Sequence, residues 1–76
     1  MTAATEKLDA RGLNCPLPIL RTRKALYKLN SGALPEIATT DPGAVKDMAA
    51  FCTQTGNRLV SSVEADKSFI FLIEKS

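Results

Sequence analysis

The chain has 76 residues, of which 45% are apolar and 24% charged, and its formal net charge is +2. These values are typical of a globular protein, and a chain this short is expected to form one domain, residues 1–76, with a thin core and no deep pocket. No apolar run approaches the roughly 18 residues of a membrane span, and residues 1–6 lack the features of a signal peptide. We therefore expect a cytoplasmic protein without a membrane contact.

The residue types also argue against metal, cofactor and nucleic-acid binding. Two cysteines, Cys15 and Cys52, and no histidine cannot supply the four ligands of a structural zinc site. A stable disulfide between them is not expected in a reducing cytosol. One Tyr and three Phe, not interleaved with basic residues, give no RNA-binding signature. We predict no metal, no cofactor and no direct nucleic-acid partner.

The first half of the chain predicts a strand, a helix and a second strand. Residues 7–10 form the first strand, and residues 16–30 a helix that ends where Gly32 can adopt the left-handed conformation. Residues 34–39 predict a weaker strand, in which Pro35 indicates a late start or one unpaired edge.

The second half predicts a second helix and two strands. Asp41 is expected as the N-cap, Pro42 in the first turn and Gly56 as the end of this helix. Two strands follow at residues 58–64 and 69–74, joined by a turn at residues 65–68. The order is βαβαββ.

This order predicts an α/β (α+β) fold: a two-layer α/β sandwich with a four-stranded mixed sheet and both helices on one face. Right-handed crossovers place the two helices side by side. The last strand is apolar on both sides, because Phe69, Phe71 and Ile73 alternate with Ile70 and Leu72. This pattern fits a central strand or a dimer contact, and the sequence does not separate the two.

The sequence Asn14-Cys15-Pro16-Leu17-Pro18 places a cysteine at the entrance of the first helix. Proline suits the first helical turn because it has no N–H to leave unpaired, so Cys15 is expected at or next to the N-cap. Free N–H groups and the positive end of the helix dipole there lower the pKa of a thiol below its usual value of about 8.5. We predict a reactive thiolate held at a rigid corner.

The first helix has two distinct faces at 100° per residue. One face should pack on the sheet and carries Pro18, Ile19, Thr22, Ala25, Leu26 and Leu29. The other carries Arg21, Lys24 and Lys28, with Leu17 and Leu20 beside them. Apolar anchors in a charged rim are typical of a partner surface, although a solvated helix face gives the same spacing. The predicted partner-binding residues are Arg11, Pro16, Leu17, Pro18, Leu20, Arg21, Lys24 and Lys28.

The charge is uneven, because residues 1–30 hold six basic and two acidic residues, whereas residues 31–76 hold four and six. A positive field from Arg11 and the helix is therefore expected around Cys15, where it would stabilise an anion and attract an acidic partner.

Three residues receive other interpretations. Cys52 shares an apolar stripe with Ala44, Val45, Met48, Phe51 and Thr55, so we expect it in the core. Asp47 lies early in the second helix, where a carboxylate suits the dipole, and a contact role also remains open. Tyr27 is interpreted as a residue at the rim of the core.

The block Leu8-Asp9-Ala10-Arg11-Gly12-Leu13-Asn14-Cys15-Pro16-Leu17-Pro18 resembles the signature of the TusA-like (SirA/YedF-type) sulfur-carrier proteins. The resemblance covers nearly the whole chain and extends to Lys24, Leu26, Gly32, Thr40, Asp41, Pro42, Asp47, Phe51 and Gly56. It implies that Cys15 accepts a sulfur atom as a persulfide and passes it to a downstream acceptor protein. It also implies a cysteine desulfurase or a rhodanese as the donor and the 2-thiouridine of tRNA as the product.

Other functions stay open at this point. The same chemistry could serve molybdenum-cofactor maturation or sulfur oxidation, and no residue selects between these routes. A regulatory interaction module would use the corner only as a docking edge. Without histidine there is no Cys-His pair to activate a hydrolytic nucleophile, so a sulfurtransferase-type relay is the only enzyme-like activity we consider.

Overall fold

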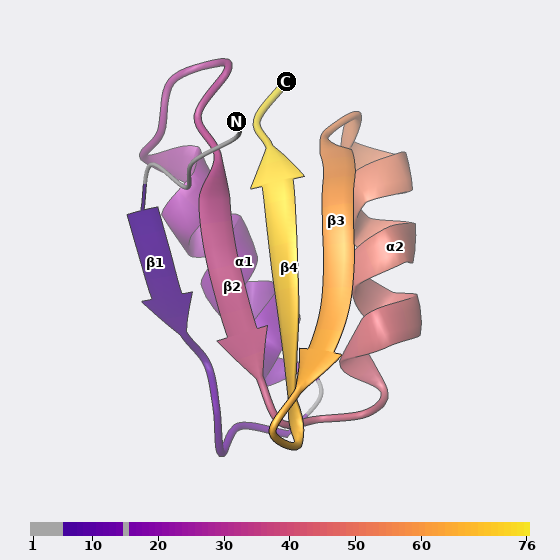
Figure 1. Cartoon of the computed structure of the whole chain (residues 1–76). Coiled ribbons are helices and arrows are strands. Elements are labelled where there is room, and N and C mark those ends of the chain that lie inside the picture. The colour runs from indigo at the N-terminus through magenta and orange to yellow at the C-terminus, as the bar shows by residue number, and fades with distance from the viewer. Residues whose placement is uncertain (1–5, 15) are drawn as a thin grey trace.

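The computed structural model describes residues 6–14 and 16–76, and they form four strands and two helices (Figure 1). In chain order the elements are β1 (Glu6–Asp9), α1 (Leu17–Tyr27), β2 (Pro35–Thr39), α2 (Ala44–Thr55), β3 (Arg58–Ala65) and β4 (Ser68–Glu74). The predicted order βαβαββ is confirmed. No helix within these residues is both long and apolar enough to cross a membrane.

The sheet has the strand order β1-β2-β4-β3, and both helices cover the same face (Figure 1). β1 pairs with β2 in parallel, with Leu8 opposite Ile37, and the other two pairings are antiparallel. The mixed four-stranded sheet of the predicted two-layer sandwich is thus confirmed. β4 lies between β2 and β3, so its apolar character on both sides belongs to a central strand; Ile70 and Leu72 remain half-buried on the face without helices.

α1 begins one residue later and ends three residues earlier than predicted. Its N-cap is Pro16 and its C-cap is Lys28. The amides of Lys28 and Leu29 donate to the carbonyls three residues before them, at 3.2 and 3.0 Å, so the last turn tightens instead of continuing the α-helix. Gly32 has a positive φ, but it lies in the following turn and does not cap the helix.

α2 also begins later than predicted, with Gly43 at the N-cap in place of Asp41. Asp41 instead closes the turn before the helix: its Oδ1 accepts a hydrogen bond from the Gly43 amide at 3.0 Å, and its carbonyl accepts one from Ala44 at 3.0 Å. The predicted end is confirmed, because Gly56 adopts the left-handed conformation with φ of 78°.

Proline and turn residues set the strand ends. β2 begins at Pro35, which pairs with Glu6 of β1, whereas the pairing with β4 begins only at Glu36. The missing N–H of proline is tolerated at such a strand start.

In the β3–β4 hairpin Asp66 and Lys67 both have positive φ, as in a type I′ turn, which matches the right-handed twist of the strands.

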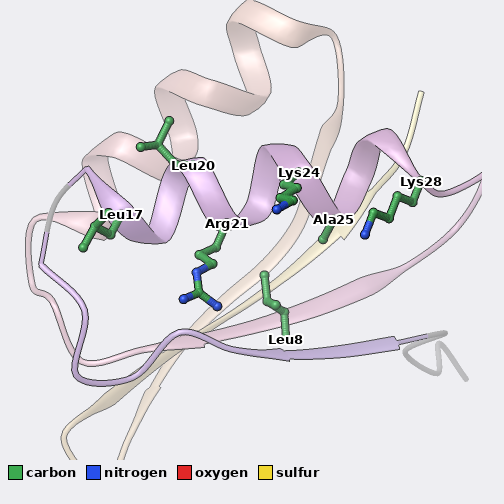
Figure 2. A pocket seen from close by; sticks show the side chains of 7 residues that line it. All are labelled: Leu8, Leu17, Leu20, Arg21, Lys24, Ala25 and Lys28. Atoms are coloured by element: carbon green, nitrogen blue, oxygen red, sulfur yellow. The ribbon is translucent and has the colours of Figure 1, made fainter.

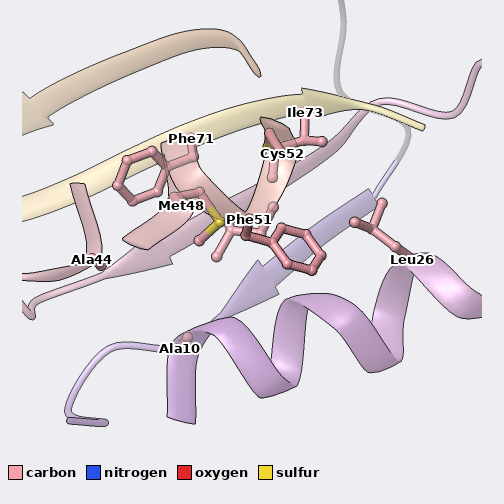
Figure 3. Close-up of a cluster of buried hydrophobic side chains, with 9 residues drawn as sticks. Ala10, Leu26, Ala44, Met48, Phe51, Cys52, Phe71 and Ile73 are labelled. Carbon is pink, nitrogen blue, oxygen red and sulfur yellow. The ribbon is translucent and has the colours of Figure 1, made fainter. Parts of the chain in front are cut away.

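The core lies between the sheet and the two helices (Figure 3). Met48 and Cys52 of α2 lie against the sheet, Phe51 extends from α2 toward α1, and Leu26 joins the same cluster from α1. The buried apolar residues are Ala10, Leu26, Ile37, Ala44, Met48, Phe51, Cys52, Phe71 and Ile73. Buried Thr22 keeps its hydroxyl paired by donating to the carbonyl of Pro18 at 2.8 Å.

Three predicted packing positions differ in the structure: Val45, Thr55 and Tyr27, all of which are exposed. Val45 was expected on the buried stripe of α2, yet it is 39% exposed, because the sheet covers only the side of the helix that carries Met48 and Cys52. Tyr27 was expected at the rim of the core and is 90% exposed. It occupies the last position of α1, where the helix tightens and the chain departs toward β2.

Candidate functional site

The corner between β1 and α1 is fastened to the end of β2. The amide of Ala10 extends the parallel ladder by donating to the carbonyl of Ala38 at 2.7 Å. Two residues later the amide of Gly12 donates to Oγ1 of Thr40 at 2.9 Å. Gly12 has φ of 82°, a conformation that a residue with a Cβ rarely adopts. The chain can therefore reverse direction directly after the strand and still remain tied to β2.

Cys15, the predicted reactive residue, lies outside the described residues, so its position relative to the helix stays a prediction. Its sequence neighbours are described. Asn14 and Pro16 are both exposed, and the carbonyl of Asn14 accepts a hydrogen bond from the Leu17 amide at 2.8 Å. Among the residues that the structure describes, no side chain caps α1.

Both helices begin at the end of the sheet where β1 and β2 finish (Figure 1). This follows from the two strand–helix connections, each of which starts at the carboxyl end of a strand. Helix N-termini carry partial positive charge and amide groups without helical partners. The end of the molecule that contains the corner therefore favours an anion.

Arg11 contributes less positive charge to the corner than the sequence suggested. Its Nε and Nη2 donate to the two carboxylate oxygens of Asp9 at 2.9 and 3.0 Å. The Asp9 carboxylate also accepts from the Arg11 amide, at 3.1 Å. These hydrogen bonds from the Arg11 side chain and backbone lower the pKa of Asp9 from 3.8 to about 2. The field expected around position 15 must therefore come mainly from the helices and the basic residues of α1.

A groove of about 550 Å³ runs between α1 and β1 (Figure 2). Arg21 and Lys28 point from the helix toward the strand, and Leu8 points from the strand toward the helix. We call it the α1–β1 groove; it is lined by Leu8, Leu17, Leu20, Arg21, Lys24, Ala25 and Lys28. Apolar and basic side chains thus meet on one surface, which begins two residues after position 15.

The α1–β1 groove brings together five of the eight predicted partner-binding residues, namely Leu17, Leu20, Arg21, Lys24 and Lys28. Leu17 and Leu20 are 46% and 50% exposed, as expected for residues beside the basic face. Pro16 is exposed at the corner, whereas Pro18 is fully buried and supports the corner from inside, so it offers no surface to a partner.

Sequence reasoning missed two residues of this groove. Ala25 was assigned to the core face, and Leu8 was read only as part of a strand. Both are half-buried at the boundary between the two layers. Neither segment alone predicts that α1 packs beside β1. The apolar Leu8 in an otherwise charged strand did indicate that this strand has a partly buried face.

A smaller groove of about 280 Å³ lies between α1 and α2. It is lined by Pro16, Ile19, Arg23, Asp47, Ala50, Phe51 and Gln54. The Arg23 guanidinium lies 5.9 Å from the centre of the Phe51 ring, within range of a cation–π interaction. Asp47, left open between a helix-start and a contact role, sits in the first turn of α2 and also lines this groove.

Cys52 belongs to the core, as predicted: it is 3% exposed, and burial raises the pKa of its thiol. A thiol of this kind is a packing residue and a poor nucleophile at neutral pH. Among residues 6–14 and 16–76, no three His, Cys, Asp or Glu side chains come together as metal ligands.

The structure thus combines a small two-layer sandwich with open grooves next to the segment that joins β1 to α1, and this segment contains the sequence Cys15-Pro16. The family model described as Sulfurtransferase TusA matches residues 6–75, and the chain belongs to this TusA sulfur-carrier family. A carrier of this family receives sulfur from a donor and passes it to an acceptor.

Relatives of known name agree with the family. The sulfur carrier protein TusA of Allochromatium vinosum is 55% identical over 71 residues, which are 93% of each chain. A putative sulfur carrier of Neisseria meningitidis is 44% identical over 92% of this chain and 95% of the relative. TusA of Pseudomonas putida is 35% identical over 90% and 85%.

The fold has a solved counterpart in a SirA-like protein of Desulfitobacterium hafniense. The two structures superpose with a TM-score of 0.78 over 92% of this chain and 95% of that one, at 22% sequence identity. This likeness confirms the two-layer fold.

Proposed function

We propose that Cys15 carries the transferred sulfur as a persulfide. The Cys15 thiolate attacks the outer sulfur of a persulfide on the donor; the sulfur–sulfur bond of the donor breaks, and the donor cysteine leaves as a thiolate. A thiolate of the acceptor then attacks the outer sulfur on Cys15 and releases the Cys15 thiolate. Each step exchanges one sulfur–sulfur bond for another, so no external oxidant or reductant is consumed.

The observation that carries this proposal is the match of the sulfur-carrier family across residues 6–75, which includes Cys15 and the corner around it. The exposure of Asn14 and Pro16 supports it, because a relay needs a thiol that two partners can reach in turn. Burial makes Cys52 unsuitable for the same role. The helix N-terminus that follows position 15 supports a thiolate without any histidine.

We propose a cysteine desulfurase or a rhodanese as the donor, a downstream sulfur-acceptor protein as the recipient and the 2-thiouridine of tRNA as the final product. The tRNA would be modified by enzymes later in the relay, without direct binding to this chain. A free thiol carrier works in a reducing compartment, which supports a cytoplasmic location.

The test is the intact mass of the protein after incubation with a cysteine desulfurase and free cysteine. Wild type and Cys52→Ala are expected to gain one sulfur atom that is lost on reduction, whereas Cys15→Ser gains none. Sulfur that maps to Cys52, or that persists in Cys15→Ser, contradicts the proposal.

The route is tested by measuring 2-thiouridine in tRNA from cells that lack the chain and carry either wild type or Cys15→Ser. Restoration by wild type alone supports tRNA thiolation. Normal 2-thiouridine without the chain would redirect the proposal to molybdenum-cofactor maturation or sulfur oxidation. Full function of Cys15→Ser would instead indicate a regulatory docking module.

A further inference from the structure

β1 lies at the edge of the sheet, and no strand of the described residues pairs with its outer side. Within residues 6–14 and 16–76, β2 is its only strand neighbour. The Ala10 amide points toward β2, because it donates to Ala38. Backbone groups of successive residues in a strand point to opposite sides, so the N–H and C=O groups of Lys7 and Asp9 face away from β2. These groups can pair with an added strand.

The free side of β1 borders the α1–β1 groove. Leu8 lies in both, since it belongs to the strand and lines the groove together with Ala25. An added strand beside β1 would direct every second side chain toward α1 and therefore into this groove. Figure 2 shows Arg21 and Lys28 reaching toward that space.

The charges of the groove determine the chemistry of its occupant. The ion pairs found among the described residues are Arg11–Asp9 and Arg58–Glu74, and neither involves a basic residue of the groove. Arg21, Lys24 and Lys28 thus lie beside an apolar strip and have no carboxylate partner within the described part of the chain. An occupant with carboxylates would supply the missing negative charge.

The spacing of the basic residues fits an extended occupant. Along α1, Arg21 and Lys24 are separated by a rise of about 4.5 Å, and Lys24 and Lys28 by about 6 Å. Side chains on one face of a strand repeat about every 6.7 Å. Carboxylates at alternate positions of a strand can therefore approach successive basic side chains, provided that the long Arg and Lys side chains adjust by an ångström or two.

We propose that the α1–β1 groove binds an extended acidic segment of a partner protein, which adds to the sheet along the free edge of β1. That the partner is a sulfur donor or acceptor rests on the proposed function; the binding mode does not. One residue opposes the interaction: Glu6 lies on the same face of β1 as Leu8, as their partners Pro35 and Ile37 show, and should repel an acidic strand.

The experiment measures binding of a fluorescent peptide of alternating glutamate and valine by anisotropy at low salt, with alternating lysine and valine as the control peptide. The acidic peptide is expected to bind and the basic one not. Joint Arg21→Glu, Lys24→Glu and Lys28→Glu substitution should abolish binding, and Glu6→Gln should strengthen it. Equal binding of the two peptides, or binding that survives the triple reversal, overturns the proposal.

The edge of β1 is tested with Lys7→Pro, which removes an outward N–H that no strand of the described sheet uses. Lys7→Ala is the matched control for loss of the charge. We expect the proline variant to bind the acidic peptide about fivefold or more weakly than the alanine variant, as one lost backbone hydrogen bond predicts. Equal affinity of the two variants, with melting curves that show both folded, would exclude strand addition.

Amide hydrogen exchange in the wild-type protein tests strand addition without any variant. Saturation with the acidic peptide should slow exchange of the Lys7 and Asp9 amides and leave the Lys67 amide of the hairpin turn unchanged. Unaltered exchange at Lys7 overturns the proposal. If these amides are protected without peptide by a dimer that forms as the protein concentration rises, the edge binds a second copy of this chain. That result would also overturn the proposal.

The sulfur assay separates this inference from the proposed function. If Cys15 acquires sulfur but the acidic peptide does not bind, the groove assignment alone fails. If the peptide binds as described but Cys15 acquires no sulfur, the persulfide relay fails and the groove assignment stands.

Discussion

Arg11 holds the Asp9 carboxylate through two side-chain hydrogen bonds, from Nε to Oδ1 at 2.9 Å and from Nη2 to Oδ2 at 3.0 Å. The pair connects the last residue of β1 with the beginning of the corner. Both side chains are exposed, yet the hydrogen bonds lower the pKa of Asp9. Titration of Asp9 can therefore report on this pair.

The Asp9 pKa provides the first prediction. NMR titration of the carboxyl carbon should give about 2 in wild type, and Arg11→Gln should raise the value toward 3.8. Because the pKa of Asp9 is lower in the folded state, its ionised carboxylate stabilises the fold above pH 3.8. This stabilisation is lost as the pH falls through about 2. The melting-temperature difference between wild type and Arg11→Gln should therefore shrink over that interval. Arg58→Gln is the control and should leave the Asp9 pKa unchanged.

The hydrogen bond from Gly12 to Thr40 gives a prediction about the rigidity of the corner. Thr40→Val removes the acceptor, and because the site is exposed, water replaces it at a cost below about 1 kcal/mol. The Gly12 amide should nevertheless exchange faster with solvent, and sulfur transfer from the desulfurase should slow. Thr40→Ser restores the acceptor and should restore both. Unchanged Gly12 exchange in Thr40→Val would show that this bond does not hold the corner in solution.

Cys52 is predicted to matter for stability and not for transfer. Cys52→Ser places a hydroxyl in the apolar core and should lower the free energy of unfolding by about 1–3 kcal/mol. Thr53→Ser, on the exposed side of the same helix, should change it by less than about 0.5 kcal/mol. Denaturant unfolding measures both. Iodoacetamide should label Cys52 quickly only after unfolding; fast labelling of Cys52 in the native protein would contradict its burial.

The basic residues of the α1–β1 groove should affect sulfur transfer more than stability. Reversing Arg21, Lys24 and Lys28 to Glu should strongly slow transfer at low salt, whereas each exposed change alters unfolding by less than about 0.5 kcal/mol. Salt near 1 M shortens the screening length to about 3 Å and should reduce the difference. Glu substitutions at Lys46, Lys67 and Lys75 give the same net charge elsewhere and serve as the control. Equal slowing by both sets would indicate an effect of net charge alone.

The β3–β4 turn predicts a stabilising substitution. Lys67 adopts φ of 63°, which costs a residue with a Cβ about 1–2 kcal/mol, and glycine avoids this cost. After allowance for the greater freedom of glycine in the unfolded chain, Lys67→Gly should raise the free energy of unfolding by roughly 0.5–1 kcal/mol. Ala65→Gly, at the end of β3, should lower it instead. The two unfolding curves should move in opposite directions.

The order of the elements could be predicted from the sequence because its signals are local. The Asp41-Pro42 and Cys15-Pro16 pairs predict that a helix begins within a few residues of each, and Gly56 ends α2 as expected. Helix ends without such a signal were less accurate: residues 28–30 have nothing that excludes a helix, and the tightened last turn reflects the path of the chain toward β2.

The candidate site could be predicted only in part, because it combines distant segments. The basic and apolar residues of α1 follow from helical periodicity, but Leu8 joins them only through the packing of α1 beside β1. The pairing of Arg11 with Asp9 depends on side-chain geometry that composition does not reveal, and it reduces the contribution of Arg11 to the expected positive field. The role assigned to Cys15 rests on the family and stays a prediction.

The two faces of α1 have different roles. Thr22 and Leu26 are buried in the core, whereas Arg21, Lys24 and Lys28 on the other side are exposed, and we expect them to contribute little to folding. Substitutions on the exposed side can therefore accumulate without loss of the fold. A protein built in this way can exchange one partner for another over evolution while the residues that build its core stay the same.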